Sequence, residues 1–337
     1  PCPRSSQDRE PRSPPMTLAA AAEIPAAWQR GHRLAALTLT AGLLATGLWG
    51  TPGMTVQLVL LAVTVALLGL PHGAVDHLQG RELLAARAGR AWPAVFAGLY
   101  VGAAALVIAA WLLAPAVLLV AFLALAVVHF GAEDVEQDRL LPTRAGRLIE
   151  GLLRGAIPIA GPVLFHPSST GQLFSLLTPG TPLQSIFAVL QTAALPATVL
   201  LSGASLLMIF AAWRNRGLLA AELGALLLLV AVLPPLLAFA GYFCLWHSPR
   251  HSLSVIARLA PHDLRGGLRR FTASAIALTS VTIALAALAW ILLDGASQPA
   301  TASVQVIFVG LAALTVPHVG LAIWSARAGW TTDDTPN

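Results

Sequence analysis

Long apolar runs, separated by short polar gaps, constrain this chain more than any other feature of its sequence. Only 10% of its 337 residues are charged, whereas a soluble domain carries roughly 25%. Membrane-crossing helices need roughly 20 consecutive apolar residues, and runs of about this length recur along the sequence. The pattern therefore predicts an all-α, polytopic transmembrane helical bundle of about 8–10 spans, with no separate soluble domain.

Ten segments are candidate spans. They cover about 34–50, 55–78, 93–113, 116–131, 148–165, 185–212, 217–233, 236–258, 272–293 and 303–325. The fifth is the weakest, because it carries Glu150, Arg154 and Pro158, and it could instead be re-entrant or lie in the membrane interface. We divide the seventh from the eighth at Pro234-Pro235, since proline cannot donate to the helix ladder and disfavours helix just before it.

Arginine supplies all twenty basic residues, and its distribution predicts the orientation. It occurs in alternate gaps and after the last span: Arg30/Arg33, Arg81/Arg87/Arg90, Arg139/Arg144/Arg147, Arg214/Arg216, Arg258/Arg265/Arg269/Arg270 and Arg327. Basic residues accumulate in cytoplasmic loops, so we expect a multi-pass protein of the inner (cytoplasmic) membrane with both termini in the cytoplasm. The net charge of +5 thus reflects topology and is no evidence for nucleic-acid binding.

The two ends of the chain are polar. We expect residues 1–33 to form a disordered N-terminal tail, 34–326 a single transmembrane domain, and 327–337 a short C-terminal tail. Residues 1–15 are rich in proline and precede Met16, which is a candidate start. The two cysteines, Cys2 and Cys244, do not suggest a disulfide framework.

Six of the nine histidines lie inside apolar segments: His72, His77, His129, His247, His251 and His318. Ionisable residues within spans are costly and face the bundle interior. In the ten-span arrangement these histidines lie at a similar depth on four helices. They are therefore candidates for one shared site in the bundle core, whereas His32, His166 and His262 are expected to be surface residues.

The spacing of these histidines indicates a metal. His247 and His251 are four residues apart, so both project from one helix face and can bind one ion. His77 lies roughly 140° around a helix from His72, so these two are not expected to share an ion. An imidazole set without cysteine suits iron, copper, zinc or nickel.

Three carboxylates accompany the histidines: Asp76, Glu133 and Asp134. They could orient the N–H groups of metal-bound imidazoles. The alternative is that they are solvated charges at helix ends.

Four short blocks resemble the signature blocks of a known family: GLPHGAVDH (69–77), HFGAED (129–134), WHSPRH (246–251) and PHVGL (317–321). The family is the bacteriorhodopsin-related-protein family of β-carotene 15,15'-dioxygenases. The resemblance implies an integral membrane enzyme that uses non-haem Fe(2+) and O2. Its substrate would be β-carotene, cleaved at the central 15,15' double bond into two all-trans-retinal molecules that supply a microbial rhodopsin.

The resemblance also implies the roles of individual residues. The iron ligands would be His72, His129, His247 and His251. It leaves supporting or structural roles for Asp76, His77, Glu133, Asp134 and His318. An apolar tunnel for the polyene could be lined by Phe130, Phe239, Tyr242, Phe243 and Trp246, for which ordinary packing is the alternative.

Three other classes fit parts of the pattern. A di-iron desaturase or carotenoid hydroxylase needs several HxxxH or HxxHH boxes, and this chain has one HxxxH. A metal-ion transporter would place its site at the midplane, whereas these histidines cluster towards one face. A bis-histidine haem protein would be recognised by its Soret band.

Overall fold

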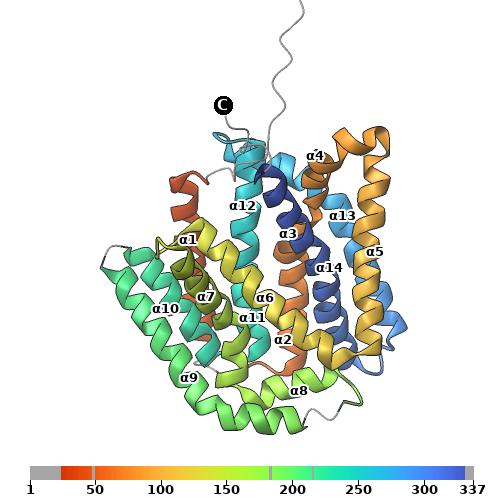
Figure 1. Cartoon of the computed structure of the whole chain (residues 1–337). Helices are drawn as coiled ribbons and strands as arrows, with labels where there is room; N and C mark the ends of the chain where they lie inside the picture. The colour runs from red at the N-terminus through yellow and green to blue at the C-terminus, as the bar shows by residue number, and fades with distance from the viewer. Residues whose placement is uncertain (1–23, 48–49, 182–183, 215, 331–337) are drawn as a thin grey trace, which may run out of the picture.

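The computed structural model describes residues 24–47, 50–181, 184–214 and 216–330, and every regular element within them is a helix. The helices pack side by side as a bundle (Figure 1). In chain order they are α1 (Ala26–Thr46), α2 (Met54–Thr64), η2 (Val65–Gly69), α3 (Leu70–Ala74), α4 (Asp76–Ala88), η3 (Gly89–Ala91), α5 (Trp92–Leu113), α6 (Pro115–Gln137), α7 (Arg144–Phe165), α8 (Pro167–Leu177), α9 (Gln184–Trp213), α10 (Gly217–Val232), α11 (Pro235–Tyr242), η4 (Phe243–His247), α12 (Ser248–Leu259), α13 (Leu264–Leu292) and α14 (Pro299–Trp330).

Five helical segments of the described chain are long and apolar enough to cross a membrane. They are Met54–Leu113, Pro115–Gln137, Arg144–Phe165, Leu264–Leu292 and Pro299–Ala328. The predicted multi-pass helical bundle is confirmed. Each of the ten predicted spans overlaps a helix or a run of joined helices, although two apolar helices, Ala197–Trp213 and α10, are shorter than these five segments.

Details of the predicted spans can be compared with these helices. The break at Pro234-Pro235 is confirmed, since α10 ends at Val232 and α11 begins at Pro235. The segment 148–165, for which a re-entrant course was an alternative, lies in the continuous helix α7. The gap 166–184 is not simply a loop, because α8 forms within it and lies across the lower end of the bundle (Figure 1).

The predicted N-terminal boundary differs from the structure. Residues 26–33 belong to α1 and not to a disordered tail. Arg33 is buried at the start of this helix and pairs with Glu222 at 2.8 Å and with Asp138 at 2.6 Å, so its charge is satisfied inside the bundle. At the other end α14 continues to Trp330. The predicted disordered segment 1–15, Met16 and residues 331–337 lie outside the described residues.

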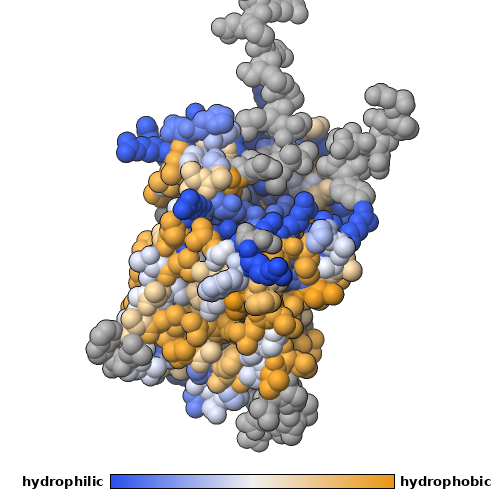
Figure 2. Space-filling view, turned by 90° about the vertical axis from the view of Figure 1, so that its left-hand side faces the viewer, coloured by the Kyte–Doolittle hydropathy of each residue, from blue (hydrophilic) through white to orange (hydrophobic). Residues whose placement is uncertain are grey.

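The outer surface is that of a membrane protein. Leu106, Leu112, Leu113 and Leu200 are each more than two-thirds exposed, which in water would form unusually large apolar patches. Figure 2 shows hydrophobic residues covering the lower part of one face, with hydrophilic residues gathered above them. α1 begins and α14 ends towards the same end of the bundle (Figure 1).

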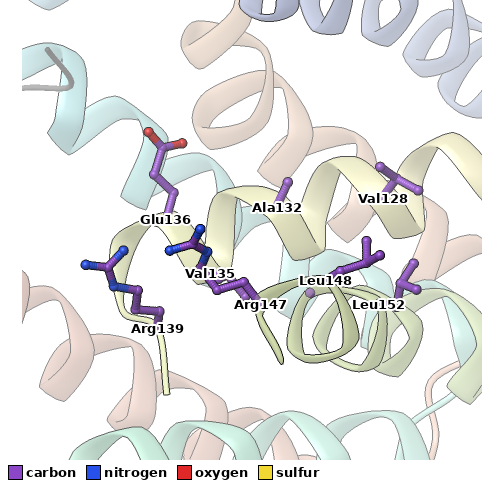
Figure 3. Close-up of a pocket in the computed structure, with 9 residues that line it drawn as sticks. Val128, Ala132, Val135, Glu136, Arg139, Arg147, Leu148 and Leu152 are labelled. Atoms are coloured by element: carbon purple, nitrogen blue, oxygen red, sulfur yellow. The ribbon is translucent and has the colours of Figure 1, made fainter. Parts of the chain in front are cut away.

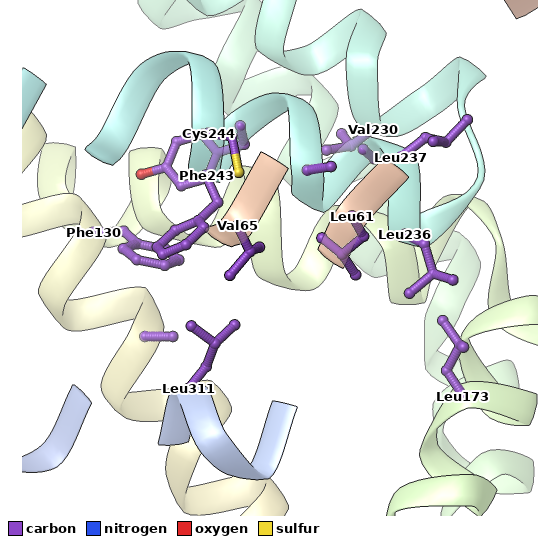
Figure 4. Close-up of a cluster of buried hydrophobic side chains, with 14 of the residues drawn as sticks. Leu61, Val65, Phe130, Leu173, Val230, Leu236, Leu237, Phe243, Cys244 and Leu311 are labelled. Atoms are coloured by element: carbon purple, nitrogen blue, oxygen red, sulfur yellow. The ribbon is translucent and has the colours of Figure 1, made fainter. Parts of the chain in front are cut away.

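The largest hydrophobic core of the described residues joins most of the helices, among them α2, η2, α6, α11, η4 and α14. In Figure 4, Val65, Phe130 and Phe243 lie close together and Leu311 approaches them from α14. The rings of Phe130 and Phe243 have centroids 6.3 Å apart. This apolar core therefore borders two of the predicted ligands. Phe130 directly follows His129, and Phe243 belongs to η4, the segment that ends at His247.

Helix α6, which carries His129, is fixed by close backbone contact with α7. A Cβ atom placed on Gly131 would collide with the carbonyl group of Gly151, and one on Gly155 would collide with the carbonyl oxygen of Val127. Small residues allow membrane helices to approach in this way. The contact fixes the rotation of α6 and so determines which of its side chains face the bundle core.

Candidate metal centre

Five imidazole rings from five helical elements meet in the bundle interior. They belong to His72 (α3), His129 (α6), His247 (η4), His251 (α12) and His318 (α14). The distances between ring centroids are 5.6 Å for 72–247, 5.2 Å for 129–247, 5.3 Å for 129–318, 5.2 Å for 251–318 and 5.4 Å for 72–251. Each ring thus contacts at least two others. We refer to these five residues as the imidazole cluster.

Two π-helical segments help to place the cluster. η2 ends at Gly69, three residues before His72, and η4 ends with His247 itself. A π-turn inserts an extra residue into a helix, changes the direction of the side chains that follow, and is frequent at functional sites. The two segments are in contact, because a Cβ on Gly69 would lie only 2.7 Å from the ring of Phe243.

Several nitrogen atoms of the cluster are buried without a hydrogen-bond partner among the described residues. They are Nδ1 and Nε2 of His247 and Nε2 of His318. Nδ1 of His72, by contrast, donates to the carbonyl oxygen of Gly69. Buried polar atoms are normally paired, because leaving one unpaired is costly. The unpaired nitrogens therefore fit a site whose imidazoles coordinate a metal ion.

Glu133 lies among the rings and not at their edge. Its Oε1 is 3.2 Å from Nδ1 of His251 and 3.9 Å from Nε2 of His129, and its Oε2 is 3.6 Å from Nδ1 of His247. In addition, ligand atoms of His129, Glu133 and His318 all lie within 4.8 Å of one another. The carboxylate is thus placed either to bind a metal directly or to orient the imidazoles that do.

His318 is held by a second carboxylate. Its Nδ1 lies 2.9 Å from both oxygens of Asp76. The hydroxyl of Tyr100 donates to Oδ2 of Asp76 over 2.9 Å. Sequence reasoning missed Tyr100, although the chain has only two tyrosines, and the other one, Tyr242, also donates to a carboxylate, that of Asp134, at 3.3 Å.

A chain of charges, buried except for the half-buried Asp138, adjoins the cluster on the side of Asp134. Arg250 contacts Asp134 and Glu222 at 2.6 Å each, and Arg33 joins Glu222 to Asp138. We call these five residues the charge network. It links α1, α6, α10 and α12 with the residue just after α6, and it pairs the carboxylate of Asp134 with Arg250.

The structure brings the predicted ligands together but does not place every predicted supporting residue beside them. The predicted ligands His72, His129, His247 and His251 come together, and His318 joins them. His77 is directed elsewhere, because its Nδ1 bonds the carbonyl oxygen of Ala74 at 2.9 Å.

The five aromatic residues predicted to line a tunnel differ in where the structure places them. The rings of Phe130 and Phe243 lie 4.5 and 5.7 Å from that of His247, and Phe239 stacks on Phe243 at 5.3 Å. Tyr242 reaches Asp134. Trp246 is directed towards α1, where its Nε1 donates to Thr40 over 3.0 Å. Phe130 and Phe243 therefore form an apolar wall beside the cluster, which Phe239 extends, and the ring of Tyr242 also stacks on that of His247 at 6.2 Å.

A groove on the outer face of α6 and α7 is separate from this centre. It has a volume of about 390 Å³ and is lined by Val128, Ala132, Val135, Glu136, Arg139, Arg147, Leu148, Gly151 and Leu152. Figure 3 shows the arginines at one end and Val128, Leu148 and Leu152 at the other. None of its lining residues belongs to the imidazole cluster.

Comparison with known proteins supports a single assignment. A family model described as "Beta-carotene 15,15'-dioxygenase" matches residues 63–325, a range that contains the whole imidazole cluster. The chain is 30% identical over 291 residues to "Probable beta-carotene 15,15'-dioxygenase Blh" of Halobacterium salinarum, covering 79% of this chain and 84% of the relative. It is 29% identical over 268 residues to "Beta-carotene 15,15'-dioxygenase" of an uncultured marine bacterium, covering 76% and 89%. No solved structure matches the chain significantly.

Proposed function

The chain belongs to the β-carotene 15,15'-dioxygenase family, and we propose that it is a membrane-embedded, non-haem iron enzyme that cleaves β-carotene. The reaction joins O2 to the central 15,15' double bond and yields two all-trans-retinal molecules. The observation that carries this proposal is the imidazole cluster, which brings five histidines from separate helical elements into contact within the family's matched region.

The donor atoms of the cluster suit the metal. His72, His129, His247 and His251 would hold iron(II), with Glu133 facing three of them. Imidazole and carboxylate ligands without thiolate suit non-haem iron, and His247, whose nitrogens have no hydrogen-bond partner among the described residues, can offer one of them to a metal. When bound, iron(II) would supply the activation of O2 that the organic substrate alone lacks.

The surrounding residues of the chain would position the substrate. β-Carotene is an apolar polyene, so it would enter from the bilayer rather than from water. Phe130 and Phe243 lie beside His247, and Phe239 stacks on Phe243; these three rings would hold the polyene next to the cluster. Cleavage at the central double bond would follow from how far this wall lets the β-carotene polyene slide past the imidazoles. Tyr242 and Trp246 would keep the wall in place through their bonds to Asp134 and Thr40.

The orientation of the protein follows from the arginines. We place it in the inner (cytoplasmic) membrane with both termini in the cytoplasm, because arginine-containing gaps alternate with gaps that lack arginine and basic loops stay inside. Retinal released into the bilayer would then be available to a microbial rhodopsin in the same membrane.

Expression in a bacterium that produces β-carotene tests the proposal. Wild-type protein should bleach the cells and give retinal on chromatography. His247→Ala should leave the cells orange, with membrane insertion unchanged, because it removes a cluster imidazole. His262→Ala is the matched control, since His262 is exposed in a loop, and it should behave as wild type. Retinal formation at the wild-type level by the His247 variant would contradict the assignment.

A further inference from the structure

We propose that His318 is a fifth imidazole ligand of the metal and that Asp76 is the residue that positions it. This inference rests on the proposed function, because it concerns the metal of the same centre. It extends the ligand set beyond the four histidines implied by the sequence blocks, and it assigns a role to a carboxylate and a tyrosine on neighbouring helices.

The position of His318 matches that of the other four rings. Its centroid lies 5.4 Å from that of His72, 5.3 Å from that of His129 and 5.2 Å from that of His251. The three ring pairs in contact among the four predicted ligands lie in nearly the same range, from 5.2 to 5.6 Å. By position alone, His318 is therefore as much a member of the centre as they are.

The hydrogen bonds of His318 leave one nitrogen for a metal. Nδ1 faces both oxygens of Asp76 at 2.9 Å, so an ionised Asp76 favours the form in which Nδ1 carries the proton. Nε2 is then free, and it is buried without a hydrogen-bond partner among the described residues. A histidine that donates one N–H to a carboxylate and offers the other nitrogen is the usual arrangement of a metal-bound imidazole.

Asp76 is itself held in place. It is buried at the start of α4, and Tyr100 from α5 donates to its Oδ2 over 2.9 Å. The hydroxyl of Tyr100 also lies 3.4 Å from the carbonyl oxygen of Leu314, one turn before His318 on α14. Three helices therefore meet around one carboxylate, and the rotation of the His318 ring follows from their packing.

A purely structural role for the Asp76–His318 pair makes a different prediction from a ligand role. Glutamine at position 318 can still donate to Asp76, but it does not supply an imidazole nitrogen. His318→Gln therefore removes the ligand while it preserves a buried polar contact. Asp76→Asn keeps the imidazole but removes the negative charge that fixes its tautomer.

The test is cobalt(II) binding to the purified full-length protein in detergent, followed by visible absorption and by competition with a chelator. His318→Gln should weaken binding by at least about 100-fold and change the cobalt spectrum, and Asp76→Asn should weaken it by about 10–100-fold. His262→Gln should change neither. Wild-type affinity and spectrum in His318→Gln would overturn the inference.

X-ray absorption of the metal-loaded wild-type protein provides a second measurement that needs no variant. Multiple scattering from imidazole should fit five rings, and a fit with four rings would overturn the inference even if His318→Gln fails to insert. A wild-type protein that binds no metal would refute the proposed function, whereas metal binding that is independent of His318 would refute only this inference.

Discussion

Replacing Arg250 by methionine should destabilise the protein strongly, although Arg250 does not bind the metal in this account. Its guanidinium is buried and contacts Asp134 and Glu222 at 2.6 Å each. Methionine replaces the aliphatic stem of arginine but carries no charge, so the variant would leave two buried carboxylates without this partner. Removing one member of a buried ion pair costs about 3–5 kcal/mol.

Both carboxylates keep another partner in this variant, so the expected cost lies at the lower end of that range. Glu222 keeps Arg33 at 2.8 Å, and Asp134 keeps the hydroxyl of Tyr242 at 3.3 Å. We therefore expect a loss of about 3 kcal/mol in the free energy of unfolding. Equilibrium unfolding by sodium dodecyl sulfate from mixed micelles, followed by circular dichroism, measures this quantity.

Two further variants complete the experiment. Arg216→Met breaks a pair with Asp138 in which the arginine is 44% exposed, so it should cost no more than about 1 kcal/mol. The triple variant Arg250→Met, Asp134→Asn and Glu222→Gln should recover much of the lost stability, because no unpaired charge remains buried. A loss for Arg250→Met no larger than that for Arg216→Met would contradict a stabilising role of the buried guanidinium.

Three other predictions follow from the same structure. Gly155→Ala should destabilise the protein by about 1–3 kcal/mol, because the new Cβ would collide with the carbonyl oxygen of Val127. The control Gly102→Ala should not destabilise it, because that glycine has open space around it. Equal thermal stabilities of the two variants would contradict this. Trp246→Phe should cost about 0.5–1.5 kcal/mol through the lost bond to Thr40 and leave the metal content unchanged, and a drop in metal content would contradict our placement of this ring. Stripping the protein with a chelator should abolish retinal formation, and iron(II) but not redox-inactive zinc should restore it; recovery with zinc would exclude the proposed role of iron.

The helical architecture was largely predictable because a bilayer limits the choices. Apolar runs long enough to cross a membrane are visible in the sequence, and Pro234-Pro235 marks the end of a helix by its missing N–H groups. The shared depth of the histidines was also readable. His72, His129 and His318 were each expected in the bundle interior, and the structure brings them together.

The roles of individual polar side chains were harder to predict from the sequence. Glu133 and Asp134 are adjacent, so they point about 100° apart on a helix. Which of them faces the imidazoles depends on the rotation of α6, and this is fixed by the contact of Gly131 with Gly151 on another helix. Neighbouring sequence does not reveal that contact, and both residues were given the same role.

Long-range partners explain the other omissions. Arg33 was interpreted only as a topological charge in a cytoplasmic gap, yet it pairs with Glu222, which is 189 residues away along the chain. Tyr100 lies in an apolar run with no nearby polar residue, and its partner Asp76 is on a different helix. The π-turns η2 and η4 likewise depend on packing, because no residue type specifies the extra residue in the turn.

Central cleavage is tested by the products that purified, iron-loaded protein forms from β-carotene and O2. We expect two molecules of all-trans-retinal for each β-carotene consumed, and only background conversion by His247→Ala. Aldehydes of unequal length, or unchanged β-carotene in a well-folded protein that has bound its iron, would contradict central cleavage at the imidazole cluster.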